Sequence, residues 1–441
     1  MKDLIMKSKI LVLILMLIVS AVGVIAADTP HNRPDFLVNT YTNHNQNMAS
    51  VVVLDNDNFI VTWTSEVQDE AGDGVYAQIF NRSGEKIGGE IHVPTDEINN
   101  ERWSKAVKLS NGNFVIVWMV YDLNGFGRAI KAQTFTPDGN KIFEEKVLTE
   151  NNDFYSPLYD ITPYNYYPAV VAVDDGIIVA WTEYRKNVTN GYEIYAQKFN
   201  NRLFPIAEKI KVNTCDNGNQ ENPTIAVSPL GKVMIVWQTI LAQSSDYANV
   251  SISGQMLDSD VNLIGGEFRV NPVTYGSHVG AYVNALNNGN FLVTWTNREY
   301  TSPYTVQSLG QIFNENGMPI TKGFKANTNT GYNFQVTNNV PLSNGGFVVV
   351  WDAVYDYTKG YEVWAQYYNP QYKKMGAQFR VNVNQTNVYQ RTPRYPAVAA
   401  FSDDGFVSAY NVYGLVEGSD YNLLDVFGQI YNWDEIRPKK L

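Results

Sequence analysis

Acidic side chains recur shortly after a tryptophan that ends an apolar run. Two carboxylates that face one another across a sugar are the groups that glycoside hydrolysis requires. The acidic residues that we predict to face a ligand are Asp122, Glu183 and Glu299, and Asp246, Asp356 and Glu417 occupy similar places. Exposed acids are usually only solvated surface, so the pattern alone does not establish a hydrolase.

Tyrosine is abundant, with 29 residues, and many tyrosines occupy the same stretches as these acids. Its flat apolar ring and hydroxyl lose little entropy when they are fixed, which suits recognition of sugars or protein surfaces. The tyrosines that we predict to contact a ligand are Tyr166, Tyr247, Tyr300, Tyr304, Tyr355 and Tyr413. The alternative, that tyrosine-rich loops only pack on themselves, stays open.

Motifs for other chemistries are missing from the sequence. His-Glu-x-x-His, Gly-x-Ser-x-Gly, the phosphate loop and the dinucleotide fingerprint do not occur. Asp55-Asn56-Asp57 and Asp258-Ser259-Asp260 resemble the start of calcium loops, but neither continues to a spaced Gly and Glu. The single cysteine, Cys215, has no motif histidine with it. We therefore expect no cofactor, no bound metal and no thiol chemistry.

The segments that must position these side chains repeat seven times. Each copy has a turn with Gly, an apolar run ending in an aromatic residue, a gap, and a small residue before Gln. The aromatic residues are Trp63, Trp118, Trp181, Trp237, Trp295, Trp351 and Tyr410. The glutamines, 55 to 64 residues apart, are Gln78, Gln133, Gln197, Gln255, Gln311, Gln366 and Gln429. Residues repeated in every copy usually build the fold, so we assign the aromatic residues to packing between sheets and the glutamines to bonding backbone groups.

Each copy contains four strand-like runs, and this number and period predict an all-β, seven-bladed β-propeller with four antiparallel strands per blade. The seventh copy ends after Tyr431 without a fourth strand. Residues 35–39 match the fourth strands at 267–271 and 378–382. We therefore expect the N-terminal segment to complete the last blade, which closes the ring and removes its open sheet edges.

In such a ring, the connections between blades and those from second to third strands open on one face. Long stretches of this kind occur at 149–168 and 382–396. Long loops in a compact domain are often functional, and the acids and tyrosines named above lie in or beside them. The sequence thus predicts a binding face at this end of the ring.

Residues 345–370, GGFVVVWDAVYDYTKGYEVWAQYYNP, resemble the repeats of secreted, largely uncharacterised β-propeller proteins of microbes. The resemblance extends over nearly all of residues 35–433. It implies the seven-bladed architecture and no activity, because that repeat family has no agreed catalytic motif.

Residues 1–26 are predicted to be a signal peptide, because three lysines precede the apolar run 10–25 and Ala26 offers a cleavage site. An uncleaved membrane anchor is the alternative. Residues 27–34 would be a linker, 35–433 the propeller and 434–441 a tail. The sequons at Asn81, Asn187, Asn249 and Asn384 matter only in a pathway that glycosylates.

The net charge of −11 becomes −13 after cleavage, and such an acidic protein repels nucleic acid and anionic membranes. We expect a secreted monomer that acts as a non-catalytic binding or interaction module, with a carbohydrate or protein ligand on the long-loop face. Two alternatives stay open. One is a carbohydrate-active hydrolase or lyase that uses loop carboxylates, and the other is a structural surface protein.

Overall fold

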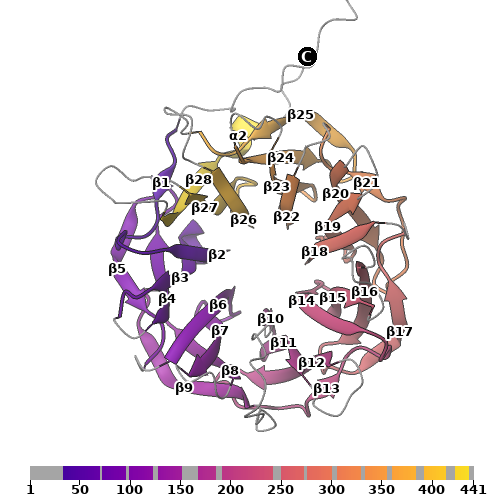
Figure 1. Ribbon diagram of the computed structural model, residues 1–441, viewed down its shortest axis with the longest axis horizontal. Coiled ribbons are helices and arrows are strands. Elements are labelled where there is room, and N and C mark those ends of the chain that lie inside the picture. The colour runs from indigo at the N-terminus through magenta and orange to yellow at the C-terminus, as the bar shows by residue number, and fades with distance from the viewer. Residues whose placement is uncertain are drawn as a thin grey trace, which may run out of the picture.

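The computed structural model describes residues 33–69, 72–95, 99–122, 128–150, 167–184, 191–241, 250–272, 276–299, 305–328, 333–354, 360–383, 392–413 and 423–436. These residues form seven four-stranded antiparallel sheets, which stand as blades around a closed ring (Figure 1). The predicted seven-bladed β-propeller is therefore confirmed.

The strands of each blade follow one another from the centre of the ring outward (Figure 1). The innermost strands are β2 (Gln46–Val53), β6 (Asn99–Lys108), β10 (Ala169–Val173), β14 (Asn219–Val227), β18 (Ser277–Ala285), β22 (Asn333–Pro341) and β26 (Thr392–Ala400). The second strands are β3 (Phe59–Glu66), β7 (Phe114–Asp122), β11 (Gly176–Tyr184), β15 (Lys232–Ile240), β19 (Phe291–Glu299), β23 (Phe347–Val354) and β27 (Phe406–Tyr413). The third strands are β4 (Asp73–Phe80), β8 (Arg128–Phe135), β12 (Tyr192–Asn200), β16 (Val250–Asp258), β20 (Thr305–Phe313), β24 (Glu362–Tyr368) and β28 (Leu424–Tyr431). The outer strands are β5 (Lys86–His92), β9 (Lys141–Glu150), β13 (Ile210–Lys211), β17 (Leu263–Arg269), β21 (Phe324–Lys325), β25 (Lys374–Arg380) and β1 (Phe36–Leu37).

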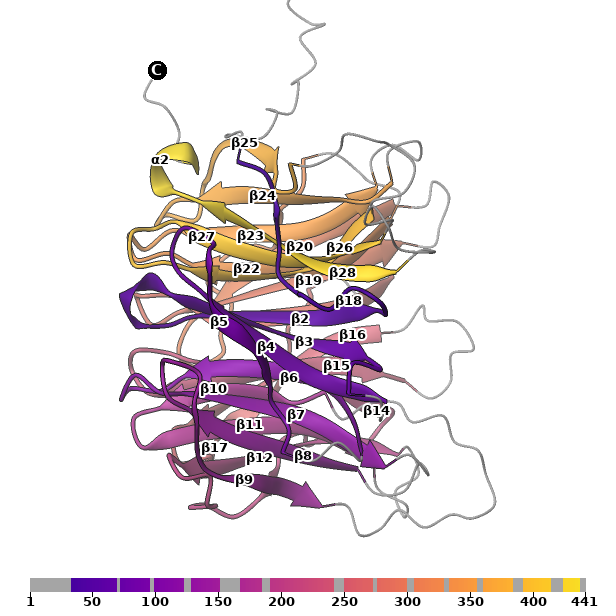
Figure 2. The ribbon, with the colours of Figure 1, turned by 90° about the vertical axis from the view of Figure 1, so that its left-hand side faces the viewer.

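The antiparallel order gives the ring two unlike faces. The hairpins that join first to second and third to fourth strands form one face, which we call the hairpin face. The second and fourth strands end, and the first and third strands begin, at the opposite face, which we call the loop face (right-hand side of Figure 2). Every internal stretch outside the described residues is bracketed in the chain by strand ends of the loop face.

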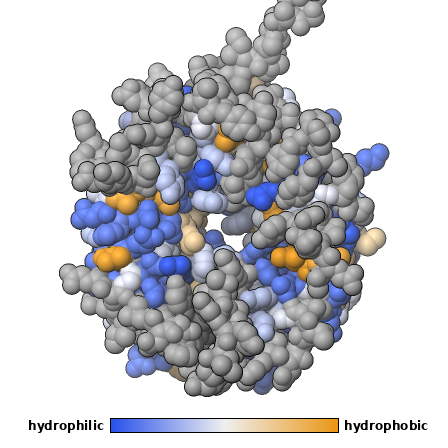
Figure 3. All heavy atoms as spheres, in the orientation of Figure 1, coloured by the Kyte–Doolittle hydropathy of each residue, from blue (hydrophilic) through white to orange (hydrophobic). Residues whose placement is uncertain are grey.

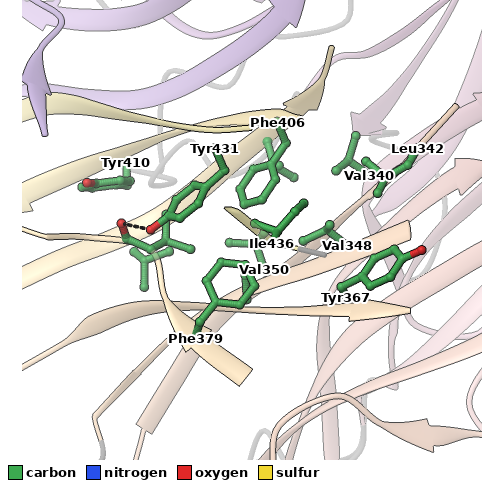
Figure 4. Close-up of a cluster of buried hydrophobic side chains, with 14 of the residues drawn as sticks. Val340, Leu342, Val348, Val350, Tyr367, Phe379, Phe406, Tyr410, Tyr431 and Ile436 are labelled. Carbon is green, nitrogen blue, oxygen red and sulfur yellow. Dashed lines mark hydrogen bonds between the residues drawn. The ribbon is translucent and has the colours of Figure 1, made fainter. Parts of the chain in front are cut away.

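The repeated aromatic residues fill the seams between blades, as the sequence predicts. The six tryptophans of the repeat and Tyr410 are fully buried. Trp181 of blade three, for example, packs on Val117 and Ile130 of blade two. Tyr410 of blade seven takes the same place in the last seam, with Val348 and Val350 of blade six (Figure 4). Burying a side chain of this size contributes on the order of 2–3 kcal/mol, so these seams supply much of the stability of the ring.

The repeated glutamines hold the outer strands. In blade one the pairing of β4 with β5 slips at Gln78, and its amide donates to the carbonyls of Ile87 at 3.0 Å and Gly88 at 3.4 Å. Gln133, Gln255 and Gln366 make the same pair of bonds in their own blades. The side chain thus satisfies carbonyls that the bulge removes from the regular ladder.

The chain closes its ring by pairing its two ends. Phe36 and Leu37 of β1 stand opposite Gly428 and Phe427 of β28. The amide of Val38 extends the pairing by donating to the carbonyl of Val426 at 2.9 Å. This confirms the predicted closure, which leaves no sheet of the ring without its outer strand.

A single helical turn, α2 (Trp433–Ile436), follows β28 and packs back on the last seam. The Trp433 ring meets the Tyr367 ring edge-on at 5.0 Å, and Ile436 is buried in the cluster drawn in Figure 4. Within the described residues no helix combines the length and the apolar character that crossing a membrane requires.

The contact between β1 and β28 predicts how one added methyl group changes the stability of the protein. A Cβ at Gly428 would run into the ring of Phe36, so Gly428→Ala should destabilise the protein by about 1–3 kcal/mol, the usual range for overpacking. Gly89→Ala is the matched control, because a Cβ at this exposed position of β5 meets nothing within 4 Å. Urea denaturation measures both, and equal midpoints for the two variants would contradict the proposed tightness of the closure.

Candidate functional site

Only part of the predicted site falls on residues that the structure describes. Tyr166, Tyr247, Tyr300, Tyr304 and Tyr355 lie outside the described residues. The other four occur in second strands where these approach the loop face. They are Asp122 at the end of β7, Glu183 in β11, Glu299 at the end of β19, and Tyr413 at the end of β27.

The two predicted carboxylates whose contacts are described are each tied to their own blade. Glu183 of blade three accepts from the indole of Trp181 at 3.2 Å and pairs with the ammonium of Lys209 at 2.9 Å. Glu299 of blade five accepts from Thr305 at 3.0 Å, within the same sheet. The structure therefore gives each acid a partner from its own blade rather than pairing the two across a substrate.

The sequence pattern did not reveal a β-bulge near the loop-face start of the innermost strands. The register slips by one residue in β2, β6, β14, β18, β22 and β26. In five of these bulges a residue has a positive φ, between 55° and 63°, and these residues are Met48, Trp103, Asn222, Gly280 and Tyr395. Bulky side chains rarely adopt this backbone region, and holding one there costs about 1–3 kcal/mol.

A hydrogen bond across the seam holds the bulge in four blades. The backbone N–H of the bulge residue donates to the side chain that directly follows the buried tryptophan of the preceding blade. The pairs are Trp103 with Thr64 at 3.4 Å, Asn222 with Thr182 at 3.2 Å, Gly280 with Gln238 at 3.0 Å, and Tyr395 with Asp352 at 3.2 Å. The mouth of the channel is thus fixed to the residues that build the core.

The seam between blades two and three has no acceptor of this kind among the described residues. The residue after the tryptophan of blade two is Met119, whose thioether is only a weak acceptor. The innermost strand that faces it, β10, begins at Ala169 and is the shortest of the seven in the described chain. The described pairing of β10 with β11 also shows no register slip.

The bulges place aromatic side chains at the mouth of the central channel. Tyr395 is 45% exposed, and the guanidinium of Arg394 beside it lies 3.9 Å from the ring centre of Tyr361. Trp103 meets the ring of Tyr167 edge-on at 4.7 Å. Figure 3 looks onto this face and shows an opening at the centre of the ring.

Tyr413, which the sequence predicted as a ligand contact, lies close to this mouth. It is 40% exposed and pairs in register with Thr392, three residues before Tyr395. Blade seven therefore presents two exposed tyrosines from neighbouring strands. Tyr395 lies within the stretch 382–396 that the sequence indicated as a long loop, but it was not among the tyrosines predicted to contact a ligand.

Burial shifts the titration of two side chains on the innermost strands. Glu221, next to the bulge residue of blade four, is only 8% exposed, and burial raises its pKa from 4.5 to about 7, although a hydrogen bond with Asn219 acts in the opposite direction. Lys105 of β6 is half-buried, and because the ring of inner strands encloses it, desolvation lowers its pKa from 10.5. Both residues were missed from the sequence, because other copies also carry polar residues at these positions, such as Asn338 at that of Lys105 and Arg102 at that of Glu221.

The hairpin face carries a hollow of about 450 Å³ at the other end of the channel. Its charged and polar lining groups bond to one another. Lys108 pairs with Asp55 at 2.7 Å, and Ser402 donates to Asp57 from its hydroxyl at 2.7 Å. These contacts join blades one, two and seven, so they stabilise the ring. The described residues contain no group of three acidic, histidine or cysteine side chains that could hold a metal ion, here or elsewhere.

Comparison with known proteins identifies the fold and no family. No family model and no curated protein matches the chain. A solved protein of unknown function from Dyadobacter fermentans has a TM-score of 0.53 at 9% identity, over 91% of this chain and 98% of that one. Its likeness supports the propeller fold alone.

Two sugar-degrading enzymes are more distant. An α-L-arabinanase of Penicillium chrysogenum, complexed with arabinobiose, has a TM-score of 0.47 at 13% identity, over 92% of this chain and all of that one. A family 93 α-L-arabinofuranosidase of Fusarium graminearum has a TM-score of 0.43 at 12% identity, over 76% and 93% of the two chains. With scores below 0.5, neither bears on what this chain does.

The raised pKa of Glu221 predicts a pH-dependent stability. Between pH 4.5 and about 7 the folded protein binds a proton that the unfolded chain releases, so this group makes folding less favourable as pH rises. Glu221→Gln removes the effect. Its stability relative to the wild type should rise by roughly 3 kcal/mol between pH 4 and pH 8.

Urea denaturation at a series of pH values measures this difference. Glu85→Gln, in an exposed hairpin-face turn, controls for the change in net charge. A difference between Glu221→Gln and wild type that stays constant over this range would refute the buried state of Glu221.

Proposed function

We propose that the protein is a secreted binding protein that holds a saccharide at the loop-face mouth of its central channel. The proposal keeps the binding face expected from the sequence but moves its centre from the loops to the bulges of the innermost strands. Secretion rests on residues 1–26, which have the composition of a signal peptide.

The observation that carries the proposal is the conformation of Tyr395. A bulky residue stands at φ 55° with nearly half of its surface exposed, and a buried carboxylate, Asp352, holds its amide. Nothing in packing requires an exposed ring at a strained position, since glycine would adopt the same backbone without strain. Strain retained in this way is typical of residues that serve a ligand.

The chemistry around the mouth suits a sugar. Aromatic rings from blades two, three and seven offer apolar faces, and C–H-rich faces of sugar rings stack on such surfaces. The buried amide oxygens of Asn47 and Asn222, in and beside the bulges, have no hydrogen-bond partner among the described residues. Hydroxyl groups of a ligand could donate to them, which would satisfy groups that are costly to leave unbonded.

A second candidate, a carbohydrate-active hydrolase, is favoured by one observation. Glu221 has a pKa of about 7, so a large fraction of it is protonated near neutral pH, as a general acid requires. The acids first proposed for this role, Glu183 and Glu299, have partners within their own blades and fit it less well. Release of reducing ends from a polysaccharide, abolished in Glu221→Gln, would establish hydrolysis in place of binding alone.

The binding proposal predicts an unusual separation of affinity from stability. Tyr395→Gly removes the ring and relieves the strained backbone, so affinity for the bound saccharide should fall about tenfold or more while the melting temperature does not fall. Affinity gel electrophoresis on a polysaccharide panel, followed by calorimetry with the ligand found, measures the first quantity. Thermal unfolding measures the second.

Phe143 provides a matched control. It also has a positive φ, of 61°, and is 51% exposed, but it lies on the outer strand β9, away from the channel. Phe143→Gly should leave saccharide affinity unchanged. Equal affinity in wild type and Tyr395→Gly, or an equal loss in both variants, would remove the mouth as the binding site.

A further inference from the structure

One position of the innermost strands is equivalent in all seven blades, two residues beyond the bulge. It stands opposite the residue that precedes the buried aromatic residue of the second strand. The residues there are Ser50, Lys105, Ala169, Thr224, Tyr282, Asn338 and Ala397. Six are uncharged, and Lys105 alone carries a charge.

The polar residues at this position bond to the next innermost strand. Thr224 donates to the carbonyl of Ala281, and Asn338 donates to the carbonyl of Pro396, both at 3.4 Å. Tyr282 forms a hydrogen bond with Asn338. This position therefore faces the seam beside the channel, where a polar group normally finds a partner in the wall.

Lys105 has no such partner among the described residues. The described residues place no hydrogen-bond acceptor or carboxylate on its ammonium group, and desolvation is the one influence on its pKa. Its neighbour across the seam, Ala169, offers no side-chain acceptor. Two other half-buried lysines of the ring, by contrast, are paired, Lys131 with Glu145 at 2.8 Å and Lys211 with Glu193 at 3.2 Å.

Partial burial of an ammonium group that has no counter-ion among the described residues is unfavourable for folding. The six other blades show that an uncharged residue fits here. The ammonium group is therefore explained better by a ligand than by folding. A negative group arriving from the channel would supply the missing counter-ion.

We propose that the saccharide held at the loop-face mouth is acidic, and that its carboxylate or sulfate group pairs with Lys105 while its ring contacts Trp103. This inference rests on the proposed function. Trp103, which is partly buried against the cluster between blades two and three, is the bulge residue two positions before Lys105 on β6, so one strand carries an aromatic ring and a cation close together. An aromatic ring beside an ammonium group is a combination that suits a sugar ring bearing an anionic substituent.

The experiment compares saccharides that differ only in charge. Oligogalacturonate and its methyl ester share one backbone with and without carboxylates, and dextran sulfate and dextran do the same for sulfate. Binding of each to the full-length protein is measured by calorimetry, for wild type, Lys105→Met and Tyr395→Gly. We expect the wild type to prefer one acidic member over its neutral counterpart by about tenfold or more, and Lys105→Met to abolish this preference.

A stability measurement separates binding from a structural role. Because methionine fills the same space without a charge, Lys105→Met should melt at the same or a higher temperature than the wild type. A lower melting temperature would mean that the ammonium group serves the fold, and would overturn the inference. Lys373→Met, in a hairpin-face turn, is the control for loss of one positive charge and should retain the preference.

The outcomes distinguish the inference from the function on which it rests. Tighter binding of the neutral members, with affinity lost in Tyr395→Gly, would overturn the acidic ligand and leave saccharide binding in place. A preference for the acidic members that persists in Lys105→Met would overturn the role of Lys105. Failure of the wild type to bind any member of the two pairs would overturn the acidic ligand. Failure on the wider polysaccharide panel as well would overturn the proposed function.

Discussion

One hydrogen bond connects the core of this ring to its mouth. It joins the N–H of a bulge residue to the side chain that follows the buried tryptophan of the preceding blade. The tryptophan is fixed because it fills the seam, and the residue after it therefore points to a defined place on the neighbouring strand. An acceptor at that place draws the backbone N–H into a bulge and keeps it there. The positions of the side chains at the mouth then depend on the packing of the whole seam.

This coupling explains how a repetitive fold presents a surface that does not repeat. The buried aromatic residue and the glutamine of each copy meet the same demands in every blade, so they scarcely vary. The bulge residue has to satisfy only a backbone bond, and its side chain is left for other use. Methionine, tryptophan, asparagine, glycine and tyrosine occupy the five bulges with positive φ. Equivalent positions of the blades carry different residues at the mouth and nearly the same residues in the packed seams.

The fold could be predicted from the sequence because its signals are local and recur seven times. The match of residues 35–39 with other fourth strands even placed β1 beside β28. The bulges could not be predicted in this way. A positive φ at Tyr395 contradicts the local preference of this residue, and its amide is held by Asp352 of the neighbouring blade, far away in the sequence. Of the site predicted from loop composition, five tyrosines fall outside the described residues. Tyr413 lies beside the mouth, whereas Glu183 and Glu299 have partners within their own blades.

An acidic ligand on an acidic protein raises an electrostatic objection, since the net charge of −11 opposes the approach of an anion. The repulsion between exposed charges is screened over about 8–10 Å at physiological ionic strength, and many acids of this chain are already paired with cations of the outer strands, as Glu193 is with Lys211. Inside the channel the balance differs, because screening is weaker where protein replaces water and no carboxylate of the described residues offsets the ammonium group of Lys105. The ammonium group of Lys105 attracts an anion most strongly over short distances. The identity of a bound anion is therefore decided by contact with Lys105 rather than by the net charge of the surface.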